Sequence, residues 1–252
     1  MEYTPQELMV SAAAREIGDG EVVFVGMRLP LIAFALAKAT HAPNAIGFFE
    51  CGIVRDAPSP ELLYTMGDPP NIRDALQCTA MADLMALLQR GEVQTGFIGG
   101  AEIDRYGNLN TSYIGDWRAP QTKLPGSGGG ADIASLSRRL VVIMAHERRR
   151  FVERVSYVTS PGYGEGGDWR ERVGLPRGGP GAVITTLGVL RFHPATREAY
   201  LASHHPFASA DEVRAATGWP LRVAPDLAVT PAPSAEELAI IRRYDPQGFW
   251  TR

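Results

Sequence analysis

Short apolar runs of strand length alternate with helical segments in the first half of the chain, and this alternation constrains the fold more than any other feature. The runs EVVFVGM, AIGFFECGIV and VQTGFIGGAEI are each preceded by a segment with helical patterning, and RLVVIMAH, VERVSYVTS and GAVITTLGVLRF follow later. Several of these runs are apolar on both faces, as in a sheet covered by helices on both sides. We therefore predict an α/β fold with a mostly parallel central sheet.

Three helices are predicted from one start signature, in which a hydroxyl residue precedes an acid by three positions. Such a pair can satisfy the free N–H groups of a first helical turn reciprocally. The pairs are Thr4 with Glu7, Ser209 with Glu212, and Ser234 with Glu237. They predict helices over about 5–17, 210–217 and 235–243. A fourth helix opens at Pro30, and the segment 71–91 reads as one long amphipathic helix that ends at Gly91.

The chain shows no internal repeat and no linker, so we expect a single domain over residues 1–252. The Gly/Pro-rich stretch 160–181 is expected to be a long surface loop. The net charge of −3 argues against a nucleic-acid scaffold. No apolar run is long enough for a membrane span, and the N-terminus does not resemble a signal peptide. A cytoplasmic protein without a nucleic-acid or membrane partner is expected.

Glu50 is the first candidate for chemistry, because its carboxylate lies in the apolar run GFFECGIV. It could be an edge-strand residue that faces solvent or an arginine. It also lies near the end of a predicted strand, before a Cys-Gly pair that suggests a tight exit into a loop. Active sites of parallel sheets gather just beyond the carboxyl ends of strands, where a partly desolvated carboxylate is a better nucleophile or base.

Cys51 is the neighbour of Glu50, and in a regular strand the two side chains would point to opposite faces. Both could serve one site only if the chain bends there. A lone cysteine in an apolar run is otherwise a small core residue. Cys78, within the predicted helix, is expected to be core as well.

Two glycine-containing segments are further candidates. Gly99 and Gly100 follow a predicted strand and precede DRYGNLN, a predicted tight turn with Gly107-Asn108 at its tip. The second segment is LPGSGGGADIASLSRR, in which Gly126, Ser127, Gly128, Gly129 and Gly130 precede a short helix. Its N–H groups could bind an anion or a developing oxyanion. The spacing of these glycines resembles a dinucleotide-binding fingerprint. That fingerprint needs a hydrophobic strand just before it, and the preceding residues RAPQTKLP do not form one.

Metal binding is not expected. HERRR at 146–150 lacks the second histidine of a metalloprotease helix, and the adjacent His204 and His205 point apart. Two cysteines suggest neither a disulfide framework nor a zinc site.

Taken together, these segments resemble the β subunit of family I CoA-transferases, and the glutaconate CoA-transferase group in particular. The resemblance begins with AAREIGDGEVVFVGMRLPLIAFALAKATHAPN and includes FFECG, FIGGAEIDRYGNLNTS, LPGSGGGADIASLSRR, YVTSPGY and GPGAVITTLGVLRF. It implies an open three-layer α/β/α fold and a partner α subunit, usually in an α2β2 assembly. Coenzyme A is implied as a substrate moiety, with no metal or nucleotide cofactor.

The resemblance also implies roles for single residues. Glu50 matches the family's covalent nucleophile, which attacks the thioester of an acyl-CoA such as a glutaconyl-type (di)carboxylyl-CoA. The loop Gly126–Gly130 would supply oxyanion-stabilising amides, and Gly99-Gly100 would form the floor beside Glu50.

Cys51 departs from the family pattern, in which a small unreactive residue commonly follows the glutamate. An asparagine expected soon after the glycines of GSGGGAD is also missing. Relatives on this fold decarboxylate glutaconyl-type CoA esters or hydrolyse acyl-CoAs, and a cysteine belongs to the decarboxylating branch. A decarboxylase (a lyase) or hydrolase is therefore the alternative. A non-catalytic scaffold subunit and a dinucleotide-binding oxidoreductase also stay open.

Overall fold

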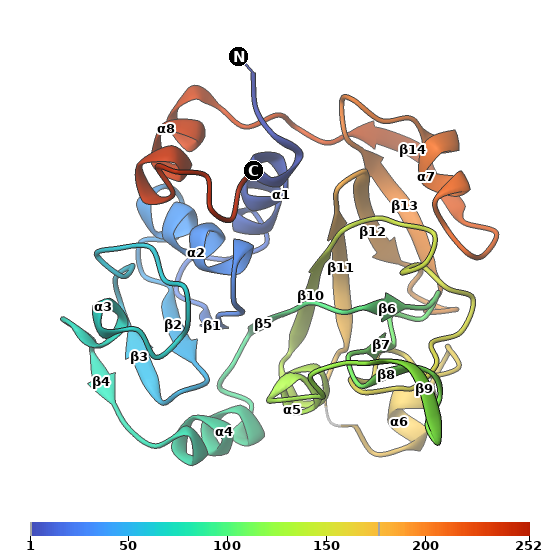
Figure 1. Cartoon of the computed structure of the whole chain (residues 1–252), viewed down its shortest axis with the longest axis horizontal. Helices are drawn as coiled ribbons and strands as arrows, with labels where there is room; N and C mark the ends of the chain where they lie inside the picture. The colour runs from blue at the N-terminus through green and yellow to red at the C-terminus, as the bar shows by residue number, and fades with distance from the viewer. Residues whose placement is uncertain (1, 176) are drawn as a thin grey trace. The chain divides into compact units, whose positions relative to one another are not determined.

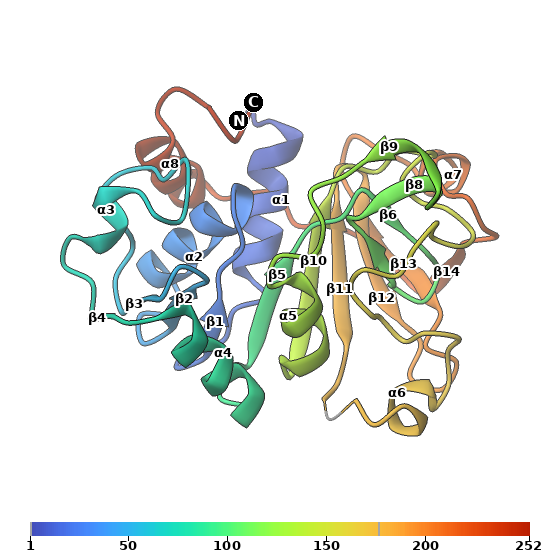
Figure 2. The same cartoon turned by 60° about the horizontal axis from the view of Figure 1, so that its bottom comes forward.

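The computed structural model describes residues 2–175 and 177–252, and the chain divides into two compact units. Unit 1 consists of the chain up to Phe97 together with Pro231–Arg252, and unit 2 consists of Ile98–Thr230. Figures 1 and 2 show the elements of each unit. The expectation of one domain over 1–252 stays a prediction.

Among the described residues, unit 1 contains five strands in the order β5-β1-β2-β3-β4. Strand β1 lies between β2 and β5 and is parallel to both, whereas β2, β3 and β4 are joined as antiparallel neighbours. The bounds are β1 Val22–Phe24, β2 Ile46–Phe49, β3 Ile53–Arg55, β4 Gln77–Cys78 and β5 Thr95–Ile98.

The helices of unit 1 include the first and the last of the chain. In Figure 1 the strands of this unit lie between α1, α2 and α8 above and α4 below. The bounds are α1 Pro5–Ala14, α2 Leu29–Ala39, α3 Pro69–Ile72, α4 Met81–Arg90 and α8 Ala235–Tyr244. Helix α8 is held to α1 by Arg242, whose Nε donates to Glu7 Oε1 over 2.7 Å. The core of this unit contains Phe24, Phe34 and Leu36.

In the described part of unit 2, five strands follow the order β14-β13-β12-β11-β10, and two small two-stranded sheets, β6–β7 and β8–β9, accompany them. Pairs β10–β11 and β13–β14 are parallel, and β12 is antiparallel to both its neighbours. The strand bounds are β6 Glu102–Ile103, β7 Leu109–Asn110, β8 Tyr113–Asp116, β9 Ala119–Lys123, β10 Arg139–Met144, β11 Pro180–Thr185, β12 Gly188–Phe192, β13 Ala199–His204 and β14 Arg222–Val229. The helices are α5 Gly130–Leu136, α6 Trp169–Arg172 and α7 Ala210–Ala215.

The predicted α/β fold and the three predicted helix starts are confirmed. Thr4, Ser209 and Ser234 each cap a helix with both hydrogen bonds of the reciprocal pattern. In α1 the Glu7 N–H donates to Thr4 Oγ1 over 3.1 Å and the Thr4 N–H donates to Glu7 Oε2 over 2.8 Å. No helix in the described ranges has the length and apolar character needed to cross a membrane.

The long helix predicted over 71–91 is wrong. Strand β4 interrupts it, because Cys78 pairs with Ile53 and the Thr79 N–H donates to the Gly52 carbonyl over 2.8 Å. Only the predicted end is kept, since Gly91 terminates α4 in the left-handed conformation. Cys78 is exposed rather than in the core.

The strand predicted in VERVSYVTS is also wrong. Residues 152–160 are irregular, and single bridges at Phe151 and Ser160 replace a ladder. The backbone of this segment pairs with Ile103 and Leu109 at single points, so no continuous strand forms there.

Candidate active site

Glu50 and Cys51 occupy the two corners of the tight turn that joins β2 to β3. The Gly52 N–H closes this turn by donating to the Phe49 carbonyl over 2.9 Å. Phe49 pairs with Ile53, so the loop has three residues, a length typical of a β-turn followed by a left-handed residue. The chain therefore bends at this point, and the alternation of strand faces does not separate the two side chains.

Gly52 is the residue that allows this turn. Its φ is +98°, and a Cβ atom at this position would lie 2.0 Å from the carbonyl oxygen of Thr79. The Thr79 N–H donates to the Gly52 carbonyl, so β4 approaches the turn through this glycine. The order Glu-Cys-Gly therefore has a local structural reason.

The turn lies at the carboxyl end of β2, as predicted. Strand β2 is parallel to β1, with Phe24 paired to Phe48 and the Val25 N–H donating to the Phe48 carbonyl over 2.9 Å. Arg28, which follows β1, is therefore at the same edge of the sheet as Glu50. Arg28 has φ 71° and ψ −122°, a conformation that costs a non-glycine residue about 1–3 kcal/mol.

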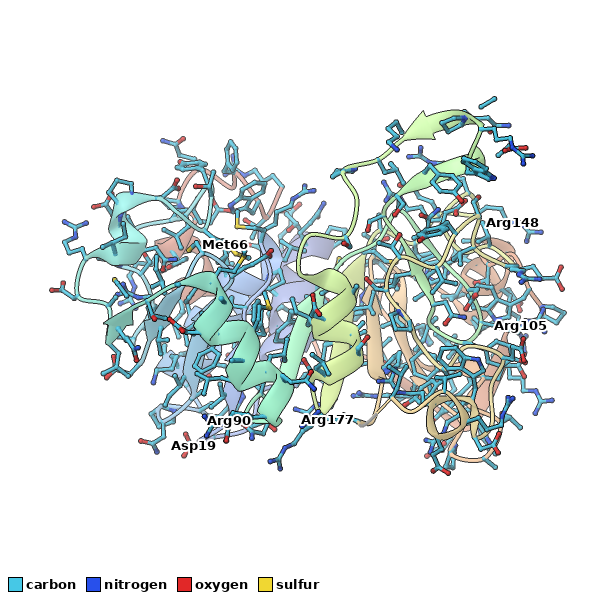
Figure 3. All side chains as sticks on the ribbon, turned by 90° about the horizontal axis from the view of Figure 1, so that it is seen from below. Asp19, Met66, Arg90, Arg105, Arg148 and Arg177 are labelled. Atoms are coloured by element: carbon cyan, nitrogen blue, oxygen red, sulfur yellow. The ribbon has the colours of Figure 1, made fainter. Side chains whose placement is uncertain are left out.

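The Cys51 thiol is a hydrogen-bond donor in this structure. Its Sγ donates to the Met66 carbonyl over 3.1 Å, and Met66 is labelled in Figure 3. Cys51 as a whole is exposed, yet burial of the sulfur raises the pKa of the thiol, and the charge of Glu50 adds to this effect. The thiolate is the reactive form of cysteine, so Cys51 is not an activated nucleophile. Glu50, which is half-buried, is the stronger candidate.

In unit 2, the glycine loop 126–130 lies between β9 and α5. The Gly126 N–H donates to the Thr111 carbonyl and the Gly130 N–H donates to the Ser127 carbonyl, each over 2.8 Å. These two amides are therefore already engaged, one with Thr111 outside the loop and one within it. The N–H groups of Ser127 and Gly128, both exposed, donate to no group in the part of the chain that the structure describes. They are the loop amides best able to bind an oxyanion.

Gly99 and Gly100 connect β5 to β6. A Cβ atom on Gly100 would lie 2.9 Å from Leu109 Cδ2, so the backbone approaches β7 closely. The Ala101 N–H donates to the Asn110 carbonyl over 2.9 Å. Because Thr111 holds Gly126, both predicted glycine segments attach to the same stretch of chain.

A buried polar network supports that stretch. Glu102 is 4% exposed and accepts from Asn110 Nδ2 over 2.7 Å and from the Ser156 N–H over 2.9 Å. Thr159 Oγ1 accepts from the Thr111 N–H over 2.9 Å. The network satisfies a buried carboxylate with neutral donors, as burial requires.

The predicted turn at DRYGN is present, and its polar residues have a structural role. Asp104 accepts from Asn108 Nδ2 and from the backbone of the turn, and burial raises the pKa of this carboxyl. Asn108 Oδ1 accepts from the Gly162 and Gly164 N–H groups over 3.0 and 3.1 Å. Asn108 therefore fastens the loop at 160–166 to the turn.

The predicted site residues thus form two groups. Glu50 and Cys51 adjoin in unit 1, and the two glycine segments share an anchor in unit 2. Sequence reasoning missed Arg28 and the Leu63–Met66 segment that contacts Cys51, because no local pattern marks either. Within the described ranges, no three His, Cys, Asp or Glu side chains are grouped so that they could hold a metal ion.

Unit 1 also contains a cavity of about 560 Å³ between α2, α8 and the loop 58–64. Apolar residues such as Ala35 and Ile240 line it together with polar ones, among them Ser59, Glu61 and Tyr244. Burial raises the pKa of Tyr244 to about 12. Neither Glu50 nor Cys51 lines this cavity.

Comparison with known sequences identifies a family match and close relatives. The family described as "Coenzyme A transferase" matches residues 6–216. The chain is 36% identical to a subunit of the 3-oxoadipate CoA-transferase of Pseudomonas knackmussii, over 96% of this chain and 94% of that protein. It is 37% identical to a subunit of the glutaconate CoA-transferase of Acidaminococcus fermentans, over 97% of this chain and 93% of that one.

Solved structures agree with these matches. The glutaconate coenzyme A-transferase of Acidaminococcus fermentans matches with a TM-score of 0.93 and 34% identity, over 100% of this chain and 98% of that chain. The decarboxylase AibA/AibB matches with a TM-score of 0.85 and 33% identity, over 98% and 97%. The same fold therefore occurs in a transferase and in a decarboxylase.

Proposed function

The chain belongs to the coenzyme A transferase family, and we propose on this basis that it is the β subunit of an enzyme that transfers CoA between carboxylates with Glu50 as nucleophile. One observation carries the proposal: the β2–β3 turn holds the half-buried Glu50 carboxylate at the carboxyl end of a parallel strand. Active sites of open α/β sheets lie at this edge.

The proposed reaction follows from the chemistry of a carboxylate nucleophile. Glu50 attacks the thioester carbonyl of an acyl-CoA, the C–S bond breaks, and a mixed anhydride and CoA thiolate result. The thiolate attacks the glutamyl carbonyl and releases the acyl group as a free carboxylate, leaving a glutamyl-CoA thioester. An incoming carboxylate reverses both steps. The acyl activation is kept throughout because each intermediate is an anhydride or a thioester.

The loop amides are the proposed donors to the tetrahedral oxyanions. Because the Gly126 and Gly130 amides already donate to backbone carbonyls, this role falls to the N–H groups of Ser127 and Gly128. An oxyanion donor of this kind contributes about 10²–10³ in rate. Gly99 and Gly100 keep their proposed place in the floor of the site.

We propose a dicarboxylyl-CoA as the substrate class. Glutaconate and 3-oxoadipate, named in the two relatives, are both dicarboxylic acids. The partner is proposed to be an α subunit in an α2β2 assembly in the cytoplasm, with coenzyme A as part of the substrate.

The test uses the chain together with its α subunit, a dicarboxylyl-CoA and labelled acetate. Labelled acetyl-CoA is expected, and Glu50→Gln should lower kcat/KM on the order of 10⁴-fold or more, as loss of a nucleophile does. Glu92→Gln is the matched control, since Glu92 is an exposed residue paired with Arg90 over 3.6 Å. Borohydride added with acyl-CoA should reduce the glutamyl thioester and modify Glu50. Full activity of Glu50→Gln would refute the nucleophile assignment.

A decarboxylase is the second candidate, because Cys51 adjoins Glu50 and the AibA/AibB decarboxylase has the same fold. An apolar surrounding such as Phe48 and Phe49 favours loss of CO2 by desolvating a carboxylate. Release of CO2 from the dicarboxylyl-CoA without an acceptor would select this candidate. Release of the free acid alone would indicate a hydrolase.

A further inference from the structure

Three aromatic side chains and one arginine form a cluster on unit 1 that the chemistry at Glu50 does not use. Tyr64 and Phe249 pack edge to face at 4.8 Å, and Phe249 and Trp250 do so at 4.6 Å. The guanidinium of Arg28 lies 5.1 Å from the centre of the Trp250 ring. Tyr64 and Phe249 are 52% and 53% exposed, so both residues are accessible to a ligand.

Hydrogen bonds to neighbouring residues hold Phe249 and Trp250 of the cluster in place. The buried Asp245 carboxylate accepts from the N–H groups of Phe249, Trp250 and Thr251 over 2.7, 2.9 and 3.0 Å. The Trp250 indole N–H donates to the Leu63 carbonyl over 3.0 Å. An aromatic platform that is already ordered loses little conformational entropy when it binds a ligand.

The Arg28 guanidinium is available for an anion. It makes no hydrogen bond or ion pair with any residue that the structure describes, and the group it contacts is the Trp250 ring. Arginine is the side chain that best matches phosphate oxygens, and it also stacks on aromatic rings.

The cluster lies at the same edge of unit 1 as Glu50. Arg28 follows β1 and Glu50 follows β2, and these strands are adjacent and parallel. The segment Leu63–Met66 contacts both the cluster and the turn. The Leu63 carbonyl accepts a hydrogen bond from the Trp250 indole, and the Met66 carbonyl accepts one from the Cys51 thiol. Three residues of extended chain span at most about 11 Å, which limits the distance between the two anchors.

We infer that this cluster binds the nucleotide end of coenzyme A, with adenine against Tyr64 and Phe249 and a phosphate paired to Arg28. The inference rests on the proposed function, since it assigns a second part of the same substrate. Coenzyme A carries its thioester at one end of a pantetheine arm and an adenine with phosphates at the other. Exposed aromatic side chains beside an arginine without an ion-pair partner among the described residues are complementary to that second end.

The test compares two thioesters of the same acid on the assembled enzyme, one of CoA and one of pantetheine without the nucleotide. Phe249→Ala is expected to lower kcat/KM about tenfold for the CoA thioester, the size typical of a lost base-stacking contact. The pantetheine thioester should react as well as it does with the wild type.

Arg28→Gly gives the same comparison with little risk to the fold, because glycine adopts φ 71° readily. It is also expected to affect only the CoA thioester. Trp117→Ala is the matched control, since Trp117 is an exposed tryptophan in unit 2 with Arg118 over its ring at 5.0 Å. It should change neither rate.

Equal losses with both thioesters would overturn the inference. Dissociation of the α subunit on sizing would then identify the cluster as a subunit interface. Unchanged rates with both thioesters would overturn it as well. If the wild type turns over neither thioester, the proposed function fails. The inference about the cluster is then tested by titrating the enzyme with 3′-phospho-ADP. The inference requires that Phe249→Ala weakens this binding about tenfold.

Discussion

At the level of single residues, the neighbours of Glu50 and Cys51 give the two side chains different chemistry. Both sit at corners of one turn, but the Cys51 thiol donates to the Met66 carbonyl. Burial and the adjacent carboxylate keep the pKa of this thiol above its ordinary value. The proton therefore stays on sulfur at neutral pH, and we predict that the thiol does not act as a nucleophile.

Alkylation tests this reading of Cys51. In a Cys78→Ser background, iodoacetamide should modify Cys51 more slowly at pH 8 than it modifies N-acetylcysteine, because a raised pKa leaves less thiolate. Cys51→Ser should keep kcat/KM within about fivefold, the worth of one neutral hydrogen bond. Faster alkylation than the reference thiol would contradict the assignment.

Gly52→Ala should unfold the hairpin that carries Glu50. A Cβ atom would lie 2.0 Å from the Thr79 oxygen at a φ of +98°, so β3 and β4 would have to separate. We expect a loss of at least about 2 kcal/mol, measured by urea unfolding. Gly67→Ala, where nothing lies within 4 Å of the added atom, should stay within about 0.5 kcal/mol. Equal stability of the two variants would refute the role given to Gly52.

At the level of elements, the turn at Asp104–Asn108 determines how the irregular segment after Ser160 is held. Asn108 bonds to Asp104, to the Gly164 carbonyl and to two N–H groups of the 160–166 loop. A Cβ atom on Gly162 would lie 2.3 Å from the Gly107 backbone, so the two segments are in direct contact. Side-chain hydrogen bonds therefore hold these two segments together, whereas strand pairing connects the segments elsewhere in unit 2.

Asn108→Ala should destabilise unit 2 by about 2–4 kcal/mol, because it leaves buried N–H groups without acceptors. In a Trp250→Phe background the remaining tryptophans, Trp117, Trp169 and Trp219, all lie in unit 2. Their fluorescence during urea unfolding therefore reports that unit. Asn44→Ala removes an exposed Asn–Asp pair with Asp19 and should have little effect. A comparable loss in both variants would contradict the prediction.

At the level of the whole molecule, each unit is stabilised in its own way. Unit 1 includes both ends of the chain, joined by the Arg242–Glu7 and Arg15–Glu237 ion pairs. Unit 2 includes two buried histidines in its core. The His146 ring is hydrogen-bonded to the hydroxyls of Thr185 and Thr217, and it stacks on Phe151 with the ring centroids 3.7 Å apart. His205 is hydrogen-bonded to the Thr185 carbonyl. Burial lowers the pKa of His146 to about 3 and that of His205 to about 4.

Unit 2 should therefore lose stability in acid. The unfolded histidines bind protons below about pH 6.5 and the folded ones do not, so the stability is present above pH 6.5 and is lost as the pH falls toward 4 and below. At pH 5 each histidine is expected to cost about 2 kcal/mol relative to pH 7. Urea unfolding of the Trp250→Phe protein at the two pH values measures this.

His146→Gln should reduce the pH dependence of unfolding. His193→Gln, a change at an exposed residue, should leave it in place. A pH dependence that survives loss of both buried histidines would assign it to other groups.

Features that depend on neighbours a few residues apart could be predicted from the sequence. The three capped helices, the end of α4 at Gly91, and the bend after Glu50 all result from hydrogen bonds over three or four positions. The position of Glu50 at the end of a strand could be read in the same way. Resemblance to a known family then supplied the chemistry expected of it.

Features that depend on distant partners required the folded chain. Cys78 became part of a strand because Ile53 offered a free edge, which overrode the helical periodicity of 71–91. Residues 152–160 became irregular because their partners are single groups on β6 and β7. The cluster at Arg28 and Trp250 joins residues 222 positions apart, counted from their numbers. Such contacts leave no periodic trace in the sequence, because their free energy is gained only when the chain has folded.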